Sequence, residues 1–245
     1  MGIWSALAGN VFLDWLAPPP GLRWIDIGCG NGAFTELLVG RCEPVEVQGI
    51  DPAEGQLAYA RTRPAARLAE FRIGDAMALP FPDARFDAAV MALVVVFVPQ
   101  PAIGIGEMAR VVRPGGIVAT YVWDMLGGGF PLDPILVEMQ GMGLAHPRPP
   151  QIQASPTAAL RQLWDGAGLQ EVSTGEITVS RTFGDFDEFW RIYERSPSLA
   201  SILNGLSAQD TQTLKGRVRS RLPVGPHGRI TYEARANAIK GRRPA

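Results

Sequence analysis

The chain has 245 residues, of which 47% are hydrophobic and 19% are charged, and its formal net charge is −1. This composition predicts one soluble globular domain without the basic excess that binding to nucleic acid favours. Its longest apolar run, residues 88–98, is shorter than the roughly 18 residues that a membrane-spanning helix needs. With no secretory or myristoylation signal at the start, we expect a cytoplasmic protein. Cys29 and Cys42 fit a reducing compartment, and no disulfide is expected.

The N-terminal segment, residues 1–20, has apolar residues at helical spacing and ends in three prolines. This spacing predicts a helix that stops before Pro18. Two interpretations stay open at this point: a helix packed on the rest of the fold, or a mobile lid over a substrate.

From residue 22 onward, short apolar runs alternate with amphipathic stretches, a pattern typical of a parallel sheet covered on both faces. Helices are expected between the strands, at residues 33–40, 53–62 and 102–111. Strands are expected at residues 22–27, 45–51, 67–73, 86–92 and 116–123.

The rhythm breaks after the fifth expected strand. Residues 124–153 are rich in Gly, Pro and Met with little periodicity, so we expect a loop-rich cover. Regularity then returns with a helix at 156–167, a strand at 169–183, helices at 186–195 and 208–221, and a last strand at 229–239. The basic tail at 240–243 is expected to be solvated.

The first expected strand runs directly into alternating glycines, Gly28, Gly30 and Gly32. Such glycines allow a sharp turn and bring backbone N–H groups against a ligand. With Ala33 they also fit the dinucleotide fingerprint, so the glycines alone leave NAD and S-adenosylmethionine open. Asp26, two residues before the first glycine, favours a cation such as the ammonium group of S-adenosylmethionine over a pyrophosphate.

Two more carboxylates follow at the ends of the next two expected strands. Asp51 stands where an acidic side chain can accept hydrogen bonds from ribose hydroxyls. Asp75, with the N–H of Ala76, stands where an adenine ring would lie. Each aspartate alone fits a turn or a helix cap equally well, but three at successive strand ends favour a nucleotide-like cofactor.

The order and spacing of five motifs resemble the class I S-adenosylmethionine-dependent methyltransferases, in the group of the ubiquinone/menaquinone C-methyltransferase-like enzymes (methyltransferase type 11). The motifs are residues 25–32, 49–57, 74–82, 86–87 and 107–116. The resemblance implies a Rossmann-like α/β fold over residues 1–245, with helices on both faces. It also implies a seven-stranded, mostly parallel sheet of order 3-2-1-4-5-7-6, an antiparallel last strand and a helical insertion at 184–222.

Carried over by position, the resemblance also assigns a cofactor site. The methionine part of the cofactor would lie against Asp26, Gly28, Cys29, Gly30, Asn31 and Gly32. Asp51 would hold the ribose, and Asp75 with Ala76 the adenine. The adenosine pocket would be lined by Pro52, Gln56 and Met77, and the transferable methyl would lie near Ala92 and Leu93.

The stretch after the fourth expected strand, residues 94–98, is wholly apolar where several relatives carry a polar residue. It suits a hydrophobic substrate, and simple burial explains it equally well. Candidates for a general base are therefore Asp124, His146 and Tyr193, each of which also fits a structural role. The aromatic residues Trp123, Phe130, Phe189, Trp190 and Tyr193 would either roof a pocket or form core.

These observations predict methyl transfer from S-adenosylmethionine to a small hydrophobic or aromatic molecule by in-line displacement, leaving S-adenosylhomocysteine. Two alternatives stay open: an NAD(P)-dependent oxidoreductase that uses the same glycine loop, and a cofactor-binding protein without turnover. No metal is expected, because two His and two Cys offer no ligand spacing. A small-molecule partner is expected, and the chain is a monomer or a homodimer.

Overall fold

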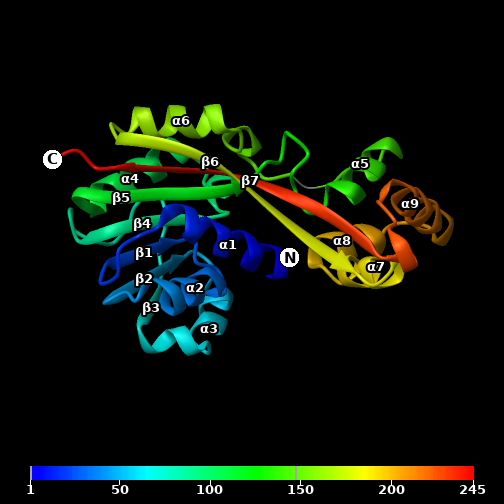
Figure 1. The fold of residues 1–245 in the computed structure, drawn as a ribbon, viewed down its shortest axis with the longest axis horizontal. Helices are drawn as coiled ribbons and strands as arrows, with labels where there is room; N and C mark the ends of the chain where they lie inside the picture. Colours follow the sequence, from blue (N-terminus) through cyan, green and yellow to red (C-terminus); the bar gives the residue numbers. More distant parts are fainter. Residues whose placement is uncertain (1, 147) are drawn as a thin grey trace.

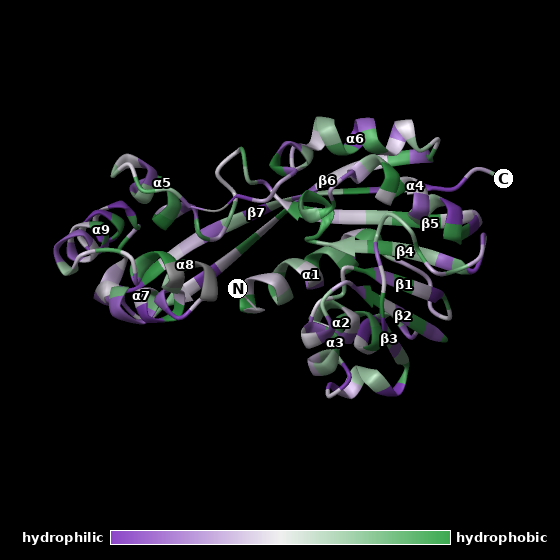
Figure 2. Cartoon of the chain, turned by 180° about the vertical axis from the view of Figure 1, so that it is seen from behind, coloured by the Kyte–Doolittle hydropathy of each residue, from purple (hydrophilic) through white to green (hydrophobic). Residues whose placement is uncertain are grey.

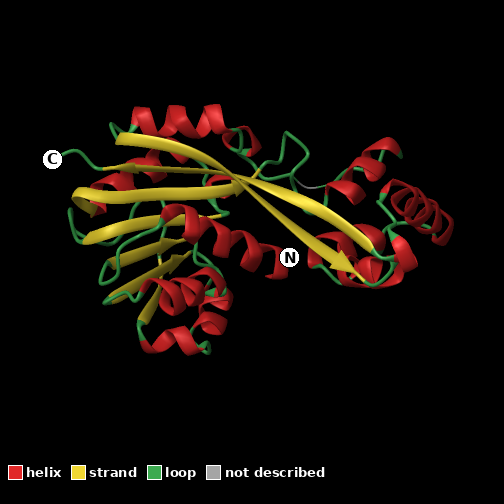
Figure 3. Cartoon of the chain, in the orientation of Figure 1, coloured by secondary structure: helices red, strands yellow, loops and turns green. Residues whose placement is uncertain are grey.

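The computed structural model describes residues 2–146 and 148–245, so residues 1 and 147, which fall in the predicted N-terminal segment and cover, lie outside the described residues. At its centre is a seven-stranded sheet of order β3-β2-β1-β4-β5-β7-β6 (Figures 1 and 3). Neighbours among β1 to β5 are parallel, whereas β7 is antiparallel to both β5 and β6. The predicted strand order is confirmed. The strands are β1 Arg23–Ile27, β2 Glu46–Asp51, β3 Ala69–Ile73, β4 Phe86–Ala92, β5 Val112–Trp123, β6 Gln170–Phe183 and β7 Ile230–Arg242.

Helices cover both faces of the sheet, which is why its central strands β1 and β4 are mostly apolar. One face packs against α1 (Gly2–Leu16), α2 (Ala33–Cys42) and α3 (Glu54–Ala60). The other packs against α4 (Pro101–Val111) and α6 (Thr157–Gly166). Figure 2 shows the largely hydrophobic β4 inside this arrangement.

The N-terminal helix α1 packs on the sheet, as the first of the two interpretations expects. Trp4 and Phe12 are fully buried, and Phe12 stacks on Tyr121 of β5 with 4.6 Å between ring centroids. The indole N–H of Trp4 also donates to the hydroxyl of Tyr193, 2.6 Å away. A lid movement of this helix stays a prediction.

The expectation of a loop-rich cover at 124–153 is wrong in part, because the segment contains α5 (Asp133–Gly141) and the short 3-10 helix η3 (Ile152–Ala154). Asp133 lies in the first turn of α5 and a proline follows it, both of which favour a helix start. Ile135 and Met139, one helical turn apart, are buried. The Gly- and Pro-rich composition around α5 hides this spacing.

Between β6 and β7 lie α7 (Phe186–Glu194), α8 (Pro197–Leu203) and α9 (Ala208–Arg221). The helix α8 was not expected from the sequence. Figure 1 shows the far end of the β6–β7 pair running beyond the other strands, with these three helices around its tip and α5 beside α9. Phe183, Phe189 and Tyr193 pack edge to face at its tip, at centroid distances of 5.3 Å and 4.7 Å.

The basic tail is not solvated as expected, because β7 continues to Arg242. The ammonium of Lys240 donates to the carbonyl of Trp15 at 3.0 Å. Arg243 donates to the carbonyls of Arg110 and Val112 at 2.7 Å and 2.6 Å. The tail therefore ties α1 and the α4–β5 junction to the sheet. No helix among the described residues is long and apolar enough to span a membrane.

Candidate functional site

The glycine loop after β1 folds back on β2. Gly28, Gly30 and Gly32 all have positive φ, at +71°, +52° and +76°, a region that side chains disfavour. The N–H groups of Gly28 and Cys29 donate to the carbonyl of Ile50, and the N–H of Gly32 donates to the carbonyl of Cys29. The expectation that backbone N–H groups of the loop point at a ligand is wrong for Gly28, Cys29 and Gly32, because their N–H groups form hydrogen bonds that hold the loop itself.

The three glycines differ in what surrounds them. A Cβ on Gly28 would fall 2.5 Å from a methyl of Val94, in the segment after β4. A Cβ on Gly32 would fall 3.1 Å from Ala60, whereas nothing lies within 4 Å of one on Gly30. The loop thus touches the end of β4 at Gly28 and borders open space at Gly30.

Asp26 lies beneath this loop and is completely buried. Its Oδ2 accepts a hydrogen bond from the hydroxyl of Thr35 at 2.7 Å, while its Oδ1 has no partner among the described residues. Burial raises the pKa of the carboxyl to about 7, and the nearby Asp51 adds to this effect. A cation placed beside Oδ1 would stabilise the ionised form.

Asp51 and Asp75 both serve in turns, as the structural alternative for each expects. The two oxygens of Asp51 accept from the N–H groups of Gly30 and Ala53 at 2.9 Å and 2.8 Å. Asp75 accepts from the N–H of Met77 at 2.8 Å. Each carboxylate oxygen has a second lone pair, so a ligand hydroxyl or amine still has an acceptor here.

The other expected cofactor residues follow the carboxyl ends of β1 to β4, which meet at one edge of the sheet, where open α/β sheets bind ligands. Asn31, Pro52 and Gln56 are exposed, while Ala76, Met77, Ala92 and Leu93 are half-buried. Leu93 has a φ of +65°, and its N–H donates to the carbonyl of Tyr121 at 2.8 Å. Their roles toward a cofactor stay predictions.

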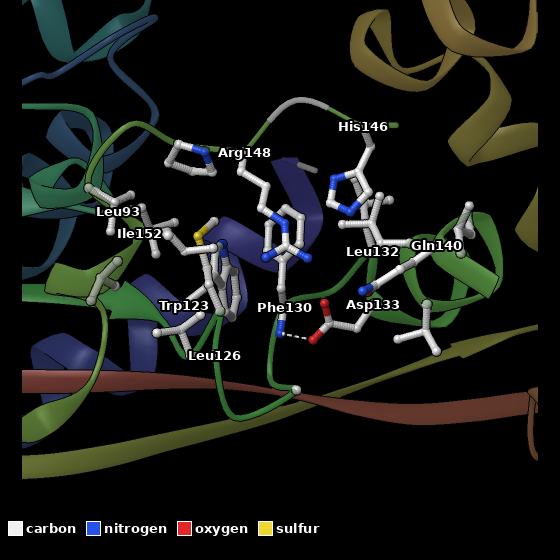
Figure 4. A pocket seen from close by; sticks show the side chains of 18 of the residues that line it. Leu93, Trp123, Leu126, Phe130, Leu132, Asp133, Gln140, His146, Arg148 and Ile152 are labelled. Atoms are coloured by element: carbon white, nitrogen blue, oxygen red, sulfur yellow. Dashed lines mark hydrogen bonds between the residues drawn. The ribbon is translucent and has the colours of Figure 1, made fainter. Parts of the chain in front are cut away.

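A cavity of about 690 Å³ opens beside the end of β4, between α1, α5 and α8 (Figure 4). Val96 and Phe97 line it, and Val95, Val96 and Val98 are buried in the core. That this apolar stretch suits a hydrophobic substrate stays a prediction. The aromatic group divides likewise: Trp123 and Phe130 line the cavity, while Phe189, Trp190 and Tyr193 are core.

The polar side chains of the cavity come mainly from α5 and the loop that follows it. They are Ser5, Asp133, Gln140, His146 and Arg148. The Oδ2 of Asp133 accepts from the N–H of Phe130 at 2.9 Å. Burial raises the pKa of Asp133 to about 6, and Asp124 adds to the rise, while His146 and Arg148 oppose it. Sequence reasoning missed Asp133, whose only signal was its place before a proline at a helix start.

Of the three candidate bases, the structure places His146 in the cavity and the other two elsewhere among the described residues. Asp124 is paired with Arg235 at 2.5 Å and accepts from the N–H of Gly127 at 3.0 Å, so it fastens the turn after β5. Tyr193 is buried, and its hydroxyl lies 2.5 Å from that of Tyr232. Within the described residues there is no cluster of three or more potential metal ligands.

The strand order, with β7 antiparallel to both of its neighbours, is the order that the resemblance to class I methyltransferases implies. Residues 25–120 match the family model described as a methyltransferase domain. These residues contain β1 to β4, the glycine loop and most of β5.

Two curated relatives are named for quinone substrates. The chain is 37% identical over 106 residues to a demethylmenaquinone methyltransferase of Desulfitobacterium hafniense, covering 41% of this chain and 42% of that protein. The chain therefore spans about two fifths of that relative's length. It is 29% identical over 208 residues to a 2-phytyl-1,4-naphtoquinone methyltransferase of Synechococcus elongatus, covering 82% and 84%.

Among solved structures, a phosphoethanolamine N-methyltransferase of Haemonchus contortus in complex with S-adenosyl-L-methionine superposes with a TM-score of 0.58. It is 16% identical, and the match covers 97% of this chain and 52% of that one. At this identity the likeness concerns the fold alone.

Proposed function

We propose that the protein transfers the methyl group of S-adenosylmethionine to a small apolar or aromatic molecule held in the cavity, leaving S-adenosylhomocysteine. One observation carries the proposal: the cavity and the glycine loop meet at the end of β4. Leu93 lines the cavity, and Val94, the next residue, packs against Gly28. A donor on the loop and an acceptor in the cavity would thus lie next to each other.

The loop region fits the methyl donor in charge and in shape. Open space borders Gly30, and the unpartnered Oδ1 of Asp26 would gain a cationic neighbour in the donor's ammonium group. Asp51 would accept from the ribose hydroxyls and Asp75 from the adenine amine. Residues 28–32, Pro52, Gln56, Met77, Ala92 and Leu93 would complete the contact. When bound, the donor supplies a methyl group already activated on a sulfonium.

The residues of this chain would contribute alignment and exclusion of water, because an in-line displacement on an activated donor needs little else. The apolar side chains of the cavity keep water from the acceptor. A carbon acceptor on an electron-rich ring would fit the two quinone-related relatives and the aromatic lining. Residues 1–245 would act as one domain, with 1–20, 124–153 and 184–222 as its N-terminal segment, cover and insertion.

Neither alternative gains support. The comparisons name methyltransferases, and a pyrophosphate beside Asp26 would place two negative charges together. A methyltransferase fold without turnover is separated from the proposal only by experiment.

The experiment incubates the protein with S-adenosylmethionine and a panel of phenols, hydroquinones, amines and fatty acids, and detects methylated products by mass spectrometry. We expect one methyl added to an aromatic member of the panel. The Gly28→Val variant is the control, since its side chain would collide with Val94. Binding of S-adenosylhomocysteine without any methylated product would favour the alternative without turnover.

A further inference from the structure

The cavity is apolar along most of its wall but has one polar end. Figure 4 shows Leu93 on one side and Asp133, Gln140 and His146 on the other, with Trp123 and Phe130 between them. Asp133 is half-buried, whereas Arg148 is exposed, and Figure 4 shows its side chain extending toward Phe130 and Asp133. The end nearest the glycine loop therefore differs in chemistry from the far end.

The polar end combines one carboxylate with one guanidinium. The backbone N–H of Phe130 holds Oδ2 of Asp133 at 2.9 Å, which fixes the carboxylate in the cavity. Arg148 and His146 are close enough to lower the pKa of Asp133 against the effect of burial. A carboxylate only accepts hydrogen bonds, and a guanidinium only donates them.

We infer that Asp133 and Arg148 form a binding site for one uncharged hydroxyl group of the acceptor, carried on an apolar aromatic body. The inference rests on the proposed function, because it describes the acceptor of that reaction. A hydroxyl satisfies both partners at once, donating to Asp133 and accepting from Arg148. An ether lacks the hydrogen to donate, and a carboxylate would face the charge of Asp133.

The anchored hydroxyl is not the atom that receives the methyl group. Leu93 marks the transfer end, and the polar end lies across the cavity from it (Figure 4). Asp133 and Arg148 are thus specificity residues that orient the acceptor, and the aromatic body between them and Leu93 presents its far edge for methylation.

The test is calorimetric titration at pH 8 with three bicyclic probes that differ in one group: 2-naphthol, 2-methoxynaphthalene and 2-naphthoate. We expect 2-naphthol to bind about tenfold more tightly than either of the others, the usual effect of a hydrogen bond to a charged group. Equal affinity for 2-naphthol and its ether would overturn the inference. So would the absence of 2-naphthol binding.

The Asp133→Asn variant sharpens the test, because its amide oxygen can still accept from Phe130 while its NH₂ group faces the cavity. We expect the preference for 2-naphthol over the ether to fall to about threefold or less, and 2-naphthoate to bind more tightly than to the wild type. Arg148→Met should weaken 2-naphthol about threefold to tenfold while keeping an apolar stem. Asp187→Asn on the exposed side of α7 is the matched control and should change none of the three affinities.

An unchanged 2-naphthol preference in Asp133→Asn would contradict the inference, provided that circular dichroism shows the variant folded. The titration contains no methyl donor, so its outcome is separate from that of the proposed function. A hydroxyl preference without methyl transfer would support the hydroxyl-binding site and contradict the proposed methyltransferase function. Methyl transfer without a hydroxyl preference would support the proposed function and contradict the hydroxyl-binding site.

Discussion

The glycine loop and the cavity are built in different ways. In the loop, neighbouring strands fix the geometry: Gly28 and Cys29 donate to the carbonyl of Ile50, and Gly30 donates to Asp51. In the cavity, the wall comes from α1, the end of β4, α5 and α8, which are far apart in the sequence. A donor site made of backbone tolerates few substitutions, whereas a wall of separate side chains can change with the acceptor.

The largest effect is expected at Gly28, where the loop meets the cavity. Gly28→Ala should lower the free energy of unfolding by roughly 2–4 kcal/mol, because it adds left-handed backbone strain to a collision with Val94. Binding of S-adenosylhomocysteine should be lost. Gly30→Ala is the control, with similar φ but open space, and should cost about 1 kcal/mol. Urea unfolding measures both, and equal losses would show that Val94 does not restrict the loop.

Asp26 should show a conflict between stability and binding. Its pKa of about 7 lies above the unfolded value, so the folded state holds the proton more tightly and stability falls as pH rises from about 4 to 7. Asp26→Asn should therefore raise the free energy of unfolding at pH 8 by roughly 1–3 kcal/mol, with a smaller gain at pH 5. Its affinity for S-adenosylhomocysteine should fall about tenfold.

Urea unfolding at both pH values and calorimetry test these expectations. Thr35→Val is a suitable comparison, because it removes the hydrogen bond to Asp26 and keeps the carboxyl. A stability gain in Asp26→Asn that is the same at pH 5 and pH 8 would contradict the buried, raised-pKa carboxyl.

A smaller effect is expected on the cavity side. The hydroxyl of Tyr232 donates to the carbonyl of Pro131 at 2.8 Å and lies 2.5 Å from that of Tyr193, which joins α7 to the loop before α5. Tyr232→Phe should cost about 1–2 kcal/mol of stability and weaken 2-naphthol binding. Affinity for S-adenosylhomocysteine should change less than about twofold. The exposed Tyr59→Phe is the control. A matching loss of cofactor affinity would show that the two regions are coupled.

The glycine loop and the cavity also differ in how far the sequence predicts them. The bounds of β4, residues 86–92, agree with the expectation, because central strands of a parallel sheet are continuous apolar runs. The strand order agrees with the order that the family resemblance implies. The glycine loop could also be predicted from the sequence, since its conformation depends on glycine itself. That its N–H groups bind Ile50 and Asp51 was not predictable, because this depends on strand register.

Of the residues at the polar end of the cavity, only His146 was expected from the sequence. Asp133 gains meaning only beside His146 and Arg148, which the loop after α5 brings back to it. Asp124 and Tyr193 were also candidate bases in the sequence. Asp124 pairs with Arg235 and Tyr193 with Tyr232, and both side chains lie away from the cavity. Among side chains brought together by packing, residue type alone did not separate structural from binding roles.

The assignment of the glycine loop to a methyl donor is tested most directly by calorimetric titration of the protein with S-adenosylhomocysteine and, separately, with NAD. We expect one binding site for S-adenosylhomocysteine, with a dissociation constant in the range of about 1 μM to 1 mM typical of enzyme ligands, and no heat from NAD. Binding of NAD without binding of S-adenosylhomocysteine at about millimolar concentration would contradict it and assign the glycine loop to a dinucleotide.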